Sequence, residues 1–263
     1  MARWLIQRNF KKKPRLRNPI LVEGLPGVGN VGKIAADYLI ETLKPELLYT
    51  IHSSVFPHSV FFNESGYIEL PSVSIYIHKG KNRDILLLTG DSQPTKESAS
   101  YEFCEKILDF AEEVGCKEVI TLGGIGMPSE VKKPAVFGAF TDKITMKRYK
   151  KYRGINTKAA ERIDAITGAS GLLLGLARLR DIKGASLLSE TYAHECHLGF
   201  KEAKVLLEKL QPILGIKIKL EDLENEILHS EKSLDEDIQA ERRVKPGKKQ
   251  LKPFSNVDLK YIG

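Results

Sequence analysis

The sequence predicts an α/β protein with three layers, αβα, in which helices cover both faces of a central sheet. Three short runs rich in apolar residues, at 20–22, 84–90 and 118–122, are continuous rather than alternating, as expected of strands buried on both faces. Longer segments with helical periodicity follow the first two runs, from about residue 30 and over 95–114. Strands that alternate with helices in this way are typical of βαβ units.

The first strand, turn and helix form the most distinctive stretch of the sequence. A tight glycine-rich turn follows Ile20–Val22, and a helix begins near Asn30. The first backbone N–H groups of a helix lack partners, so this arrangement can hold an anion. The candidate residues of the glycine loop are Gly24, Gly27, Gly29, Gly32 and Lys33.

Two phosphate-binding motifs overlap in this loop, and both are incomplete. The spacing G-x-G-x-x-G runs from Gly27 to Gly32, but residues 48–53, where the dinucleotide motif needs an acid, carry no carboxylate. Lys33 completes G-x-x-x-x-G-K, yet Ile34 stands where a P-loop has Ser or Thr to ligate magnesium. We therefore interpret the glycines as shaping a sharp turn, and we expect no cofactor. A nucleotide-dependent enzyme, an ATP-dependent ligase or NTPase, stays open as an alternative.

Length and composition narrow the class of protein. The chain has 263 residues, of which 42% are hydrophobic, and can bury a sizeable core. No apolar run approaches the ~20 residues of a membrane helix, and Arg3 and Arg8 leave no signal-peptide core between them. We therefore expect a soluble, cytoplasmic protein. The three scattered cysteines, Cys104, Cys116 and Cys196, argue against a disulfide framework.

The net charge of +7 is placed unevenly along the chain. Residues 1–17 carry seven Lys and Arg residues and no acid, and lysines also crowd 245–252. Neither stretch has a ribonucleoprotein motif or zinc-knuckle spacing, so we expect no nucleic-acid partner. Basic ends instead favour solubility or attraction to an acidic protein surface.

The middle of the chain contains further predicted elements. Short runs at 60–62, 67–70 and 73–77 follow a strand at 46–52, and we interpret them as hairpin strands that project from the core as a contact surface between subunits. The later predictions are strands at 136–140 and 185–189, helices at 168–179 and 200–214, a basic connection over 145–152, and a turn containing Gly123, Gly124 and Gly126.

Asp91 and Ser92, which follow a buried strand, could form part of a nucleophilic site. A triad would also need a histidine, and nothing in the pattern selects one. The histidines that can be nominated are His52, His58 and His78. We favour the simpler interpretation that Asp91 and Ser92 bond the loop backbone and help start the next helix, which Thr95 can cap. We predict no catalytic residue.

The string His194-Glu195-Cys196-His197 has the residue types of a metal site. On a local helix the two histidines share a face, but Cys196 points elsewhere. No second cluster supplies zinc ligands at a recognised spacing, so we predict no metal site.

Four strings, read together and in order, resemble the PAC2 family of proteasome assembly chaperones and their archaeal homologues. The first, residues 21–39, is far more specific than its glycines alone. The others are 90–94 (Gly-Asp-Ser-Gln-Pro), 121–126 (Thr-Leu-Gly-Gly-Ile-Gly) and 166–175 (Ile-Thr-Gly-Ala-Ser-Gly-Leu-Leu-Leu-Gly). The resemblance spans most of 19–215 and implies a phosphorylase-like architecture without its catalytic groups.

The composition changes after residue 219. A thin apolar stripe among many acids predicts an exposed helix that leans on a neighbour along one seam. The last residues are too polar to fold alone, yet they end in an apolar cluster. The predicted division is a basic lead-in at 1–18, the α/β domain at 19–219, a charged helix at 220–244 and a flexible tail at 245–263.

The resemblance also implies a role for the end of the tail. Proteasome-binding activators and chaperones similar to this family insert a hydrophobic residue, Tyr and one last residue between neighbouring α subunits of the 20S ring. Here Tyr261 is third from last and Ile262 is penultimate, which departs from that pattern. The predicted partner-binding residues are Val257, Leu259, Tyr261, Ile262 and Gly263.

The resemblance therefore implies a non-enzymatic proteasome assembly chaperone or adaptor, homo-oligomeric and ring-forming, that engages proteasome α subunits through its tails. Several tails on one oligomer would strengthen a weak contact through effective concentration. Besides the nucleotide-dependent enzyme, a second alternative stays open, a scaffold that captures other partner proteins with its C-terminal arms.

Overall fold

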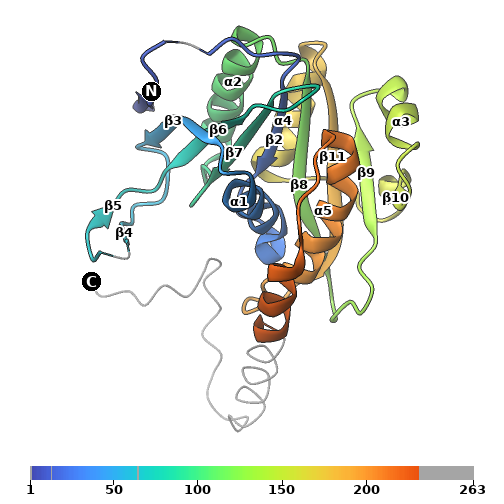
Figure 1. Ribbon diagram of the computed structural model, residues 1–263. Coiled ribbons are helices and arrows are strands. Elements are labelled where there is room, and N and C mark those ends of the chain that lie inside the picture. The colour runs from blue at the N-terminus through green and yellow to red at the C-terminus, as the bar shows by residue number, and fades with distance from the viewer. Residues whose placement is uncertain (1, 13, 64, 231–263) are drawn as a thin grey trace, which may run out of the picture.

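The computed structural model describes residues 2–12, 14–63 and 65–230, and at its centre is a nine-stranded mixed sheet (Figure 1). Its strands are β1 (Trp4–Arg8), β2 (Ile20–Gly24), β3 (Glu46–Ser53), β6 (Val73–His78), β7 (Ile85–Gly90), β8 (Glu118–Met127), β9 (Val136–Phe140), β10 (Ile155–Asn156) and β11 (Lys183–Tyr192). Their order in the sheet is β1-β3-β6-β7-β2-β8-β11-β9-β10. The four central strands β7, β2, β8 and β11 are parallel, and antiparallel pairings flank them on both sides.

Helices cover both faces of this sheet, which confirms the predicted three-layer α/β fold (Figure 1). The helices are α1 (Val31–Leu43), α2 (Glu97–Glu113), α3 (Lys143–Tyr149), α4 (Gly168–Leu179) and α5 (Phe200–Leu214), and residues 221–230 are also helical. α1 and α5 pack together on one face, while α2 and α4 pack together on the other.

The central strand β2 shows why the apolar runs are continuous. Ile20 and Val22 belong to the core under α1 and α5, whereas Leu21 belongs to the core under α2 and α4. All three side chains are fully buried, and burying each one stabilises the fold by about 2 kcal/mol. A strand with helices on both sides leaves no face for polar residues.

β8 extends further than the sequence predicts. It pairs with β11 along its whole length, so Gly123, Gly124 and Gly126 lie inside a strand, and the prediction of a turn there is wrong. The physical reason is close approach: glycine inside a strand marks a place where another part of the chain comes near. The last strand, β11, is likewise longer than predicted.

The segment 145–152, predicted as a connection, contains most of the short helix α3. Asp142 caps this helix, because its carboxylate accepts bonds of 2.8 Å from the N–H groups of Ile144 and Thr145. The Thr145 hydroxyl also donates to this carboxylate, and these bonds together lower the pKa of Asp142 to about 2. Tyr149 is buried and fixes the helix against the sheet.

The start of α2 also differs from the prediction. The helix begins at Glu97 with Lys96 at the N-cap position and no side-chain cap, so the prediction that Thr95 caps it is wrong. Instead, the Ser100 hydroxyl donates to the backbone carbonyls of Lys96 and Pro94.

Two peripheral parts of the chain are joined to the sheet at one edge. The first is β1, an edge strand that pairs only with β3 in the described part of the sheet. The second is the hairpin of β4 (Phe61–Phe62) and β5 (Ile68–Glu69), which projects away from the body of the molecule (Figure 1). The run at 73–77, predicted as a hairpin strand, is instead β6 of the main sheet.

Residues 221–230 lie along the face that carries α1 and α5. Leu223 is buried in the core of that face, the Lys204 ammonium pairs with the Glu224 carboxylate at 2.5 Å, and the Tyr38 hydroxyl donates to the carbonyl of Lys219 at 2.8 Å. In the described part of this helix, one apolar seam faces the body of the protein.

Among the described residues, no helix has both the length and the apolar character needed to cross a bilayer. The three cysteines are not joined in disulfides: Cys104 and Cys116 are buried, and Cys196 is exposed.

Candidate functional site

The turn between β2 and α1, residues 24–30, takes its shape from unusual backbone conformations. Gly29 has a φ of +60°, and Asn30 follows with a φ of +50°, both in the left-handed region. The N–H of Asn30 donates to the carbonyl of Gly27 at 2.9 Å and closes the turn. α1 then begins at Val31 without a side-chain cap.

Three glycines at this turn let separate backbones come close together. A Cβ atom on Gly24 would lie 2.2 Å from the carbonyl oxygen of Gly32, and one on Gly32 would lie 2.2 Å from that of Leu122. A Cβ atom on Gly124 would lie 2.6 Å from the carbonyl oxygen of Val28. Only hydrogen fits at these positions, so β2, α1 and β8 are packed backbone against backbone.

The same turn fills the carboxyl end of the sheet, where open α/β sheets bind ligands. Val28 lies over Gly124 of β8, and Gly29 lies against Thr191 of β11. The carbonyl of Gly29 also accepts a bond of 2.8 Å from the N–H of Gly199, just before α5. The chain itself therefore occupies much of this crevice.

Lys33 is held on the surface of α1. Its ammonium pairs with the Asp37 carboxylate at 2.8 Å, one helical turn further on. The second oxygen of Asp37 accepts a bond of 2.7 Å from the Thr89 hydroxyl of β7. Lys33 thus belongs to a polar link between α1 and the sheet.

Glu23 is a fully buried acid at the end of β2. One carboxylate oxygen accepts bonds of 3.1 Å from the Leu25 N–H and the Ser170 hydroxyl, and the other has no partner among the described residues. Burial raises the pKa of Glu23 to about 7, while the two hydrogen bonds oppose the shift. The carboxyl group therefore links the turn to α4 on the opposite face from α1.

Gln93 makes a second link at this place. Its amide nitrogen donates to the carbonyl of Pro26 at 2.7 Å, and its amide oxygen accepts from the N–H of Ala169 at 2.8 Å. A single side chain thus joins the turn to the first turn of α4. Two of the strings that resemble a known family, 90–94 and 166–175, meet at this contact.

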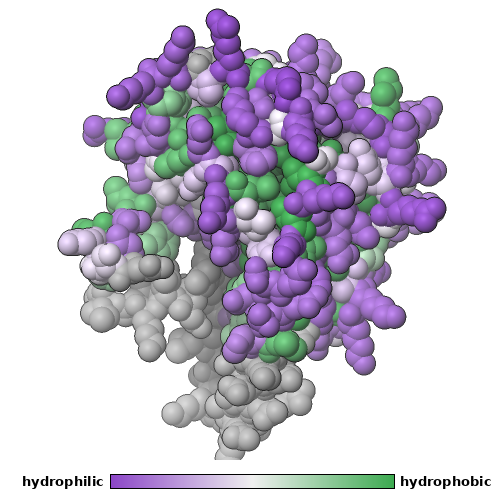
Figure 2. All heavy atoms as spheres, in the orientation of Figure 1, coloured by the Kyte–Doolittle hydropathy of each residue, from purple (hydrophilic) through white to green (hydrophobic). Residues whose placement is uncertain are grey.

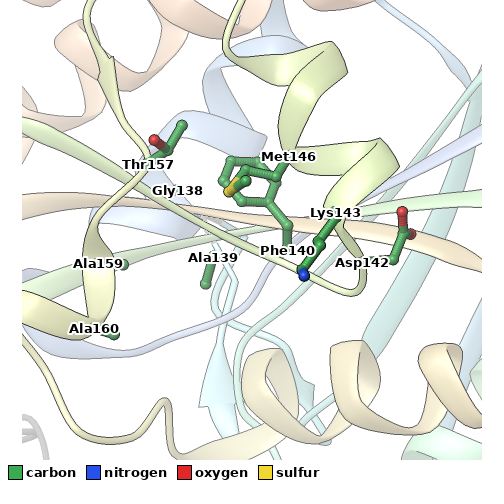
Figure 3. Close-up of a pocket in the computed structure, with 9 residues that line it drawn as sticks. All are labelled: Gly138, Ala139, Phe140, Asp142, Lys143, Met146, Thr157, Ala159 and Ala160. Carbon is green, nitrogen blue, oxygen red and sulfur yellow. The ribbon is translucent and has the colours of Figure 1, made fainter.

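A pocket of about 360 Å³ lies elsewhere, between β9, α3 and residues 157–160 (Figure 3). Its lining residues are Gly138, Ala139, Phe140, Asp142, Lys143, Met146, Thr157, Ala159 and Ala160. Both carboxylate oxygens of Asp142 already serve the α3 cap. The lining contains one acid, Asp142, and one base, Lys143, and it contains no residue of the glycine loop.

Several of the polar groups considered for catalysis or metal binding take part in local contacts. Asp91 is exposed and accepts from the Ser72 hydroxyl at 3.3 Å, whereas the buried Ser92 hydroxyl has no hydrogen-bond partner among the described residues, so the prediction that Ser92 bonds the loop backbone is wrong. The rings of His194 and Tyr192 stack with centroids 5.3 Å apart. Within the described ranges, no group of three or more His, Cys, Asp or Glu residues could hold a metal ion.

The predicted partner-binding residues of the tail lie outside the described residues. They are Val257, Leu259, Tyr261, Ile262 and Gly263.

Several of the exposed large apolar side chains in the described ranges gather on the β4–β5 hairpin and the residues beside it. These residues are Val60, Phe62, Tyr67, Ile68 and Leu70, and we call this set the hairpin surface. Apolar side chains gather at the corresponding place at the left of Figure 2. The sequence pattern predicts a hairpin that serves as a contact surface. The alternation of apolar and polar residues in its strands does not predict that the apolar side chains of both strands are exposed.

Fold and site together define a class: a three-layer αβα protein whose glycine turn packs closely against β8 and β11 at the carboxyl end of the sheet. The particular family follows from comparison. The sequence model of the PAC2 family matches residues 21–237, and the chain belongs to this family.

Several known proteins are similar to this chain. PbaB of Pyrococcus furiosus, an archaeal proteasome activator, is 34% identical with a TM-score of 0.82, over 89% of this chain and 98% of PbaB. PbaA of the same organism, an archaeal homologue of proteasome-assembly chaperone, is 27% identical with a TM-score of 0.72, over 90% and 94% of the two chains. An uncharacterized protein of Methanocaldococcus jannaschii is 31% identical over 261 residues, 98% of each chain.

Proposed function

We propose that this protein is a non-enzymatic chaperone or adaptor of the proteasome, active in the cytoplasm as a homo-oligomer. The observation that carries the proposal is its similarity to a proteasome activator, PbaB, over 98% of that chain. The similarity to PbaA supports the same class of partner. The proposed activity of the protein is to bind a partner protein rather than to catalyse a reaction of a small molecule.

The proposed contact is made by the tail, residues 245–263, which binds proteasome α subunits through Val257, Leu259, Tyr261, Ile262 and Gly263. Apolar side chains on a short segment suit a pocket on the surface of a partner. One such short segment binds weakly, so the proposal needs several tails on one oligomer, where effective concentration increases the affinity. A closed ring would meet this need.

The absence of an enzymatic role belongs to the same proposal. The glycine turn lies against β8 and β11, and Lys33 is paired with Asp37, so the groups of a phosphate site are used within the fold. A nucleotide that binds only the folded state would raise the melting temperature. We expect no shift with millimolar ATP and magnesium, measured by scanning fluorimetry. A rise that Lys33→Ala abolishes would contradict the proposal and favour a nucleotide-dependent enzyme.

The proteasome contact is tested by pull-down of purified α subunits with three forms of the full-length chain. Wild type should retain the α subunits, Tyr261→Ala should lose most of the binding, and Phe254→Ala, an aromatic change in the same tail, should retain it. A chain cut after Lys245 should behave like Tyr261→Ala. Equal binding by all forms would show that the tail does not make the contact. No binding by wild type would contradict the proposed function and favour a scaffold for other partners.

A further inference from the structure

We propose that the hairpin surface of one copy of this chain docks on β1 of a second copy. This inference rests on the homo-oligomer of the proposed function and names the surfaces that form it. The occupant is a second copy because one chain carries both halves of a matched pair of surfaces, one apolar and acidic, the other apolar and basic.

The hairpin is built to project with its apolar side chains uncovered. Phe62 is 75% exposed, Tyr67 72% and Ile68 67%, which is unusual for side chains of this size within one hairpin. An isolated two-stranded hairpin has marginal stability in water and needs a surface to pack against. In Figure 1 it extends away from the body of the sheet, so a neighbouring molecule can reach it.

The turn of this hairpin is held by a network around Asn63. Its side-chain oxygen accepts from the N–H groups of Ser65 and Tyr67, at 3.1 Å and 3.0 Å. Its side-chain nitrogen donates to the Glu69 carboxylate at 2.7 Å. These bonds fix the shape of the turn before any partner covers it, which reduces the entropy lost on docking.

The matching surface is β1, at the edge of the sheet. Trp4 anchors this strand, because its indole N–H donates to Glu102 at 2.6 Å and its ring stacks on Phe103. The next two side chains, Leu5 and Ile6, lie on opposite faces of this edge strand and are 51% and 50% exposed, so both are open at the edge of the sheet. An edge strand presents backbone groups as well as side chains to a partner, so it is a ready site for a second chain.

The charges of the two surfaces are opposite. Residues 1–8, which contain β1, carry two Arg residues and no acid, whereas residues 60–70, which contain the hairpin, carry two acids and no Lys or Arg. Arg3 and Arg8, on either side of the exposed pair in β1, are themselves exposed. Glu69 is exposed on the hairpin, where its recorded partner is the neutral Asn63. Opposite charges at the rim steer two such surfaces together, while β1 against β1 would oppose like charges.

The first test measures self-association of the full-length chain by analytical ultracentrifugation. Wild type should be oligomeric, and Phe62→Ser/Ile68→Ser should weaken self-association at least tenfold. The matched control is Ile144→Ser/Leu179→Ser, which changes side chains 72% and 80% exposed elsewhere and should leave the oligomer intact. A monomeric wild type, or a hairpin variant that associates like wild type, would overturn the proposal.

The second test mixes two defective chains. Leu5→Ser/Ile6→Ser should weaken self-association like the hairpin variant. A mixture of the two variants should form heterodimers, because one chain supplies an intact hairpin and the other an intact β1. If the serine changes in β1 prevent folding, Arg3→Glu/Arg8→Glu alters exposed charges alone and should likewise weaken self-association. Normal oligomers of both β1 variants would show that β1 is not the docking site.

Failure of this inference is distinct from failure of the proposed function. The α-subunit pull-down, repeated with Ile144→Ser/Leu179→Ser, reports the function in an intact oligomer. Oligomers that retain no α subunits would refute the proteasome proposal and leave the docking in place. An oligomeric wild type that binds α subunits, with a hairpin variant that associates like wild type, would refute the docking alone.

Discussion

The glycine turn and the hairpin surface are the two most distinctive parts of this molecule, and they differ in how much room they leave for a ligand. Where the turn meets α1 and β8, a Cβ atom has no space at Gly24 or at Gly32: one added to Gly32 would lie 2.2 Å from a backbone oxygen. At the hairpin, whole aromatic side chains are uncovered, as with Phe62 at 75% exposure.

This difference shows that a sequence motif can serve packing, while a surface open to a partner can lack any motif. The glycine string is strongly patterned because three backbones must meet there, which is a demand of packing. The hairpin has no motif, yet it presents the kind of apolar surface that soluble proteins usually bury or use for binding. A conspicuous motif therefore marks the scaffold here, and the surfaces that we propose for partners lie at the periphery.

The largest expected effect is at the turn itself. Gly32→Ala should lower the free energy of unfolding by about 3 kcal/mol or more, because backbone must move to admit the Cβ atom. In an open helix the same change would be stabilising by about 1 kcal/mol, so the sign is informative.

The matched control for Gly32→Ala is Gly27→Ala, at a position with an extended backbone and no atom within 4 Å of an added Cβ. Its unfolding free energy should change by less than about 0.5 kcal/mol in urea titration. Equal effects of the two changes would contradict the packing account of the turn.

Glu23 should make stability depend on pH. Its pKa rises from 4.5 in the unfolded chain to about 7 in the fold, so both states bind the proton below pH 4.5 and only the unfolded state releases it as the pH approaches 7. Stability is therefore lost across this window, by up to about 3 kcal/mol, and stays lost above it. Glu23→Gln should remove this loss, measured as the difference in unfolding free energy between pH 5 and pH 8. A variant with the same pH dependence as wild type would show that Glu23 does not titrate in this range.

Substitutions in the hairpin, unlike Gly32→Ala, should leave the stability of the monomer nearly unchanged. In dilute protein, below the concentration of self-association, Phe62→Ser/Ile68→Ser should change the unfolding free energy by less than about 0.5 kcal/mol, since exposed side chains lose little. Urea titration at two protein concentrations measures this, because an oligomer's stability rises with concentration. A large loss in the dilute monomer would mean that the hairpin is part of the core rather than a contact surface.

The smallest effect is expected at Lys33. Its pair with Asp37 is on the helix surface, partly exposed, and such pairs contribute roughly 0.3–0.5 kcal/mol. Lys33→Ala should therefore leave the melting temperature within about 2 °C of wild type. A much larger decrease in the melting temperature would contradict this account, because the contacts of Lys33 do not explain such a contribution to stability.

Particular elements show how far sequence reasoning reaches. β2 and β7 are predictable because burial on both faces leaves a continuous apolar run. That Gly123 to Gly126 belong to a strand is not predictable, because it depends on the approach of Val28 and Thr191 from elsewhere in the chain. Strand β1 is missed too: its residues, Trp-Leu-Ile-Gln-Arg, do not alternate between apolar and polar, and the pairing with β3 defines it.

The candidate site was predictable in part. The incomplete phosphate motifs indicate that the glycines serve packing, and the geometry of the turn is consistent with that interpretation. The buried state of Glu23 was not predictable, since its partner Ser170 is 147 residues further along the chain. A single acid inside an otherwise apolar strand is the signal that could have directed attention to it.

One measurement compares both regions directly: hydrogen–deuterium exchange of the full-length chain with and without proteasome α subunits. The account predicts slower exchange in peptides covering residues 257–263 and unchanged exchange across residues 24–33. Slower exchange at 24–33 with none at 257–263 would contradict it, because the glycine turn would then be the binding site and the tail a bystander.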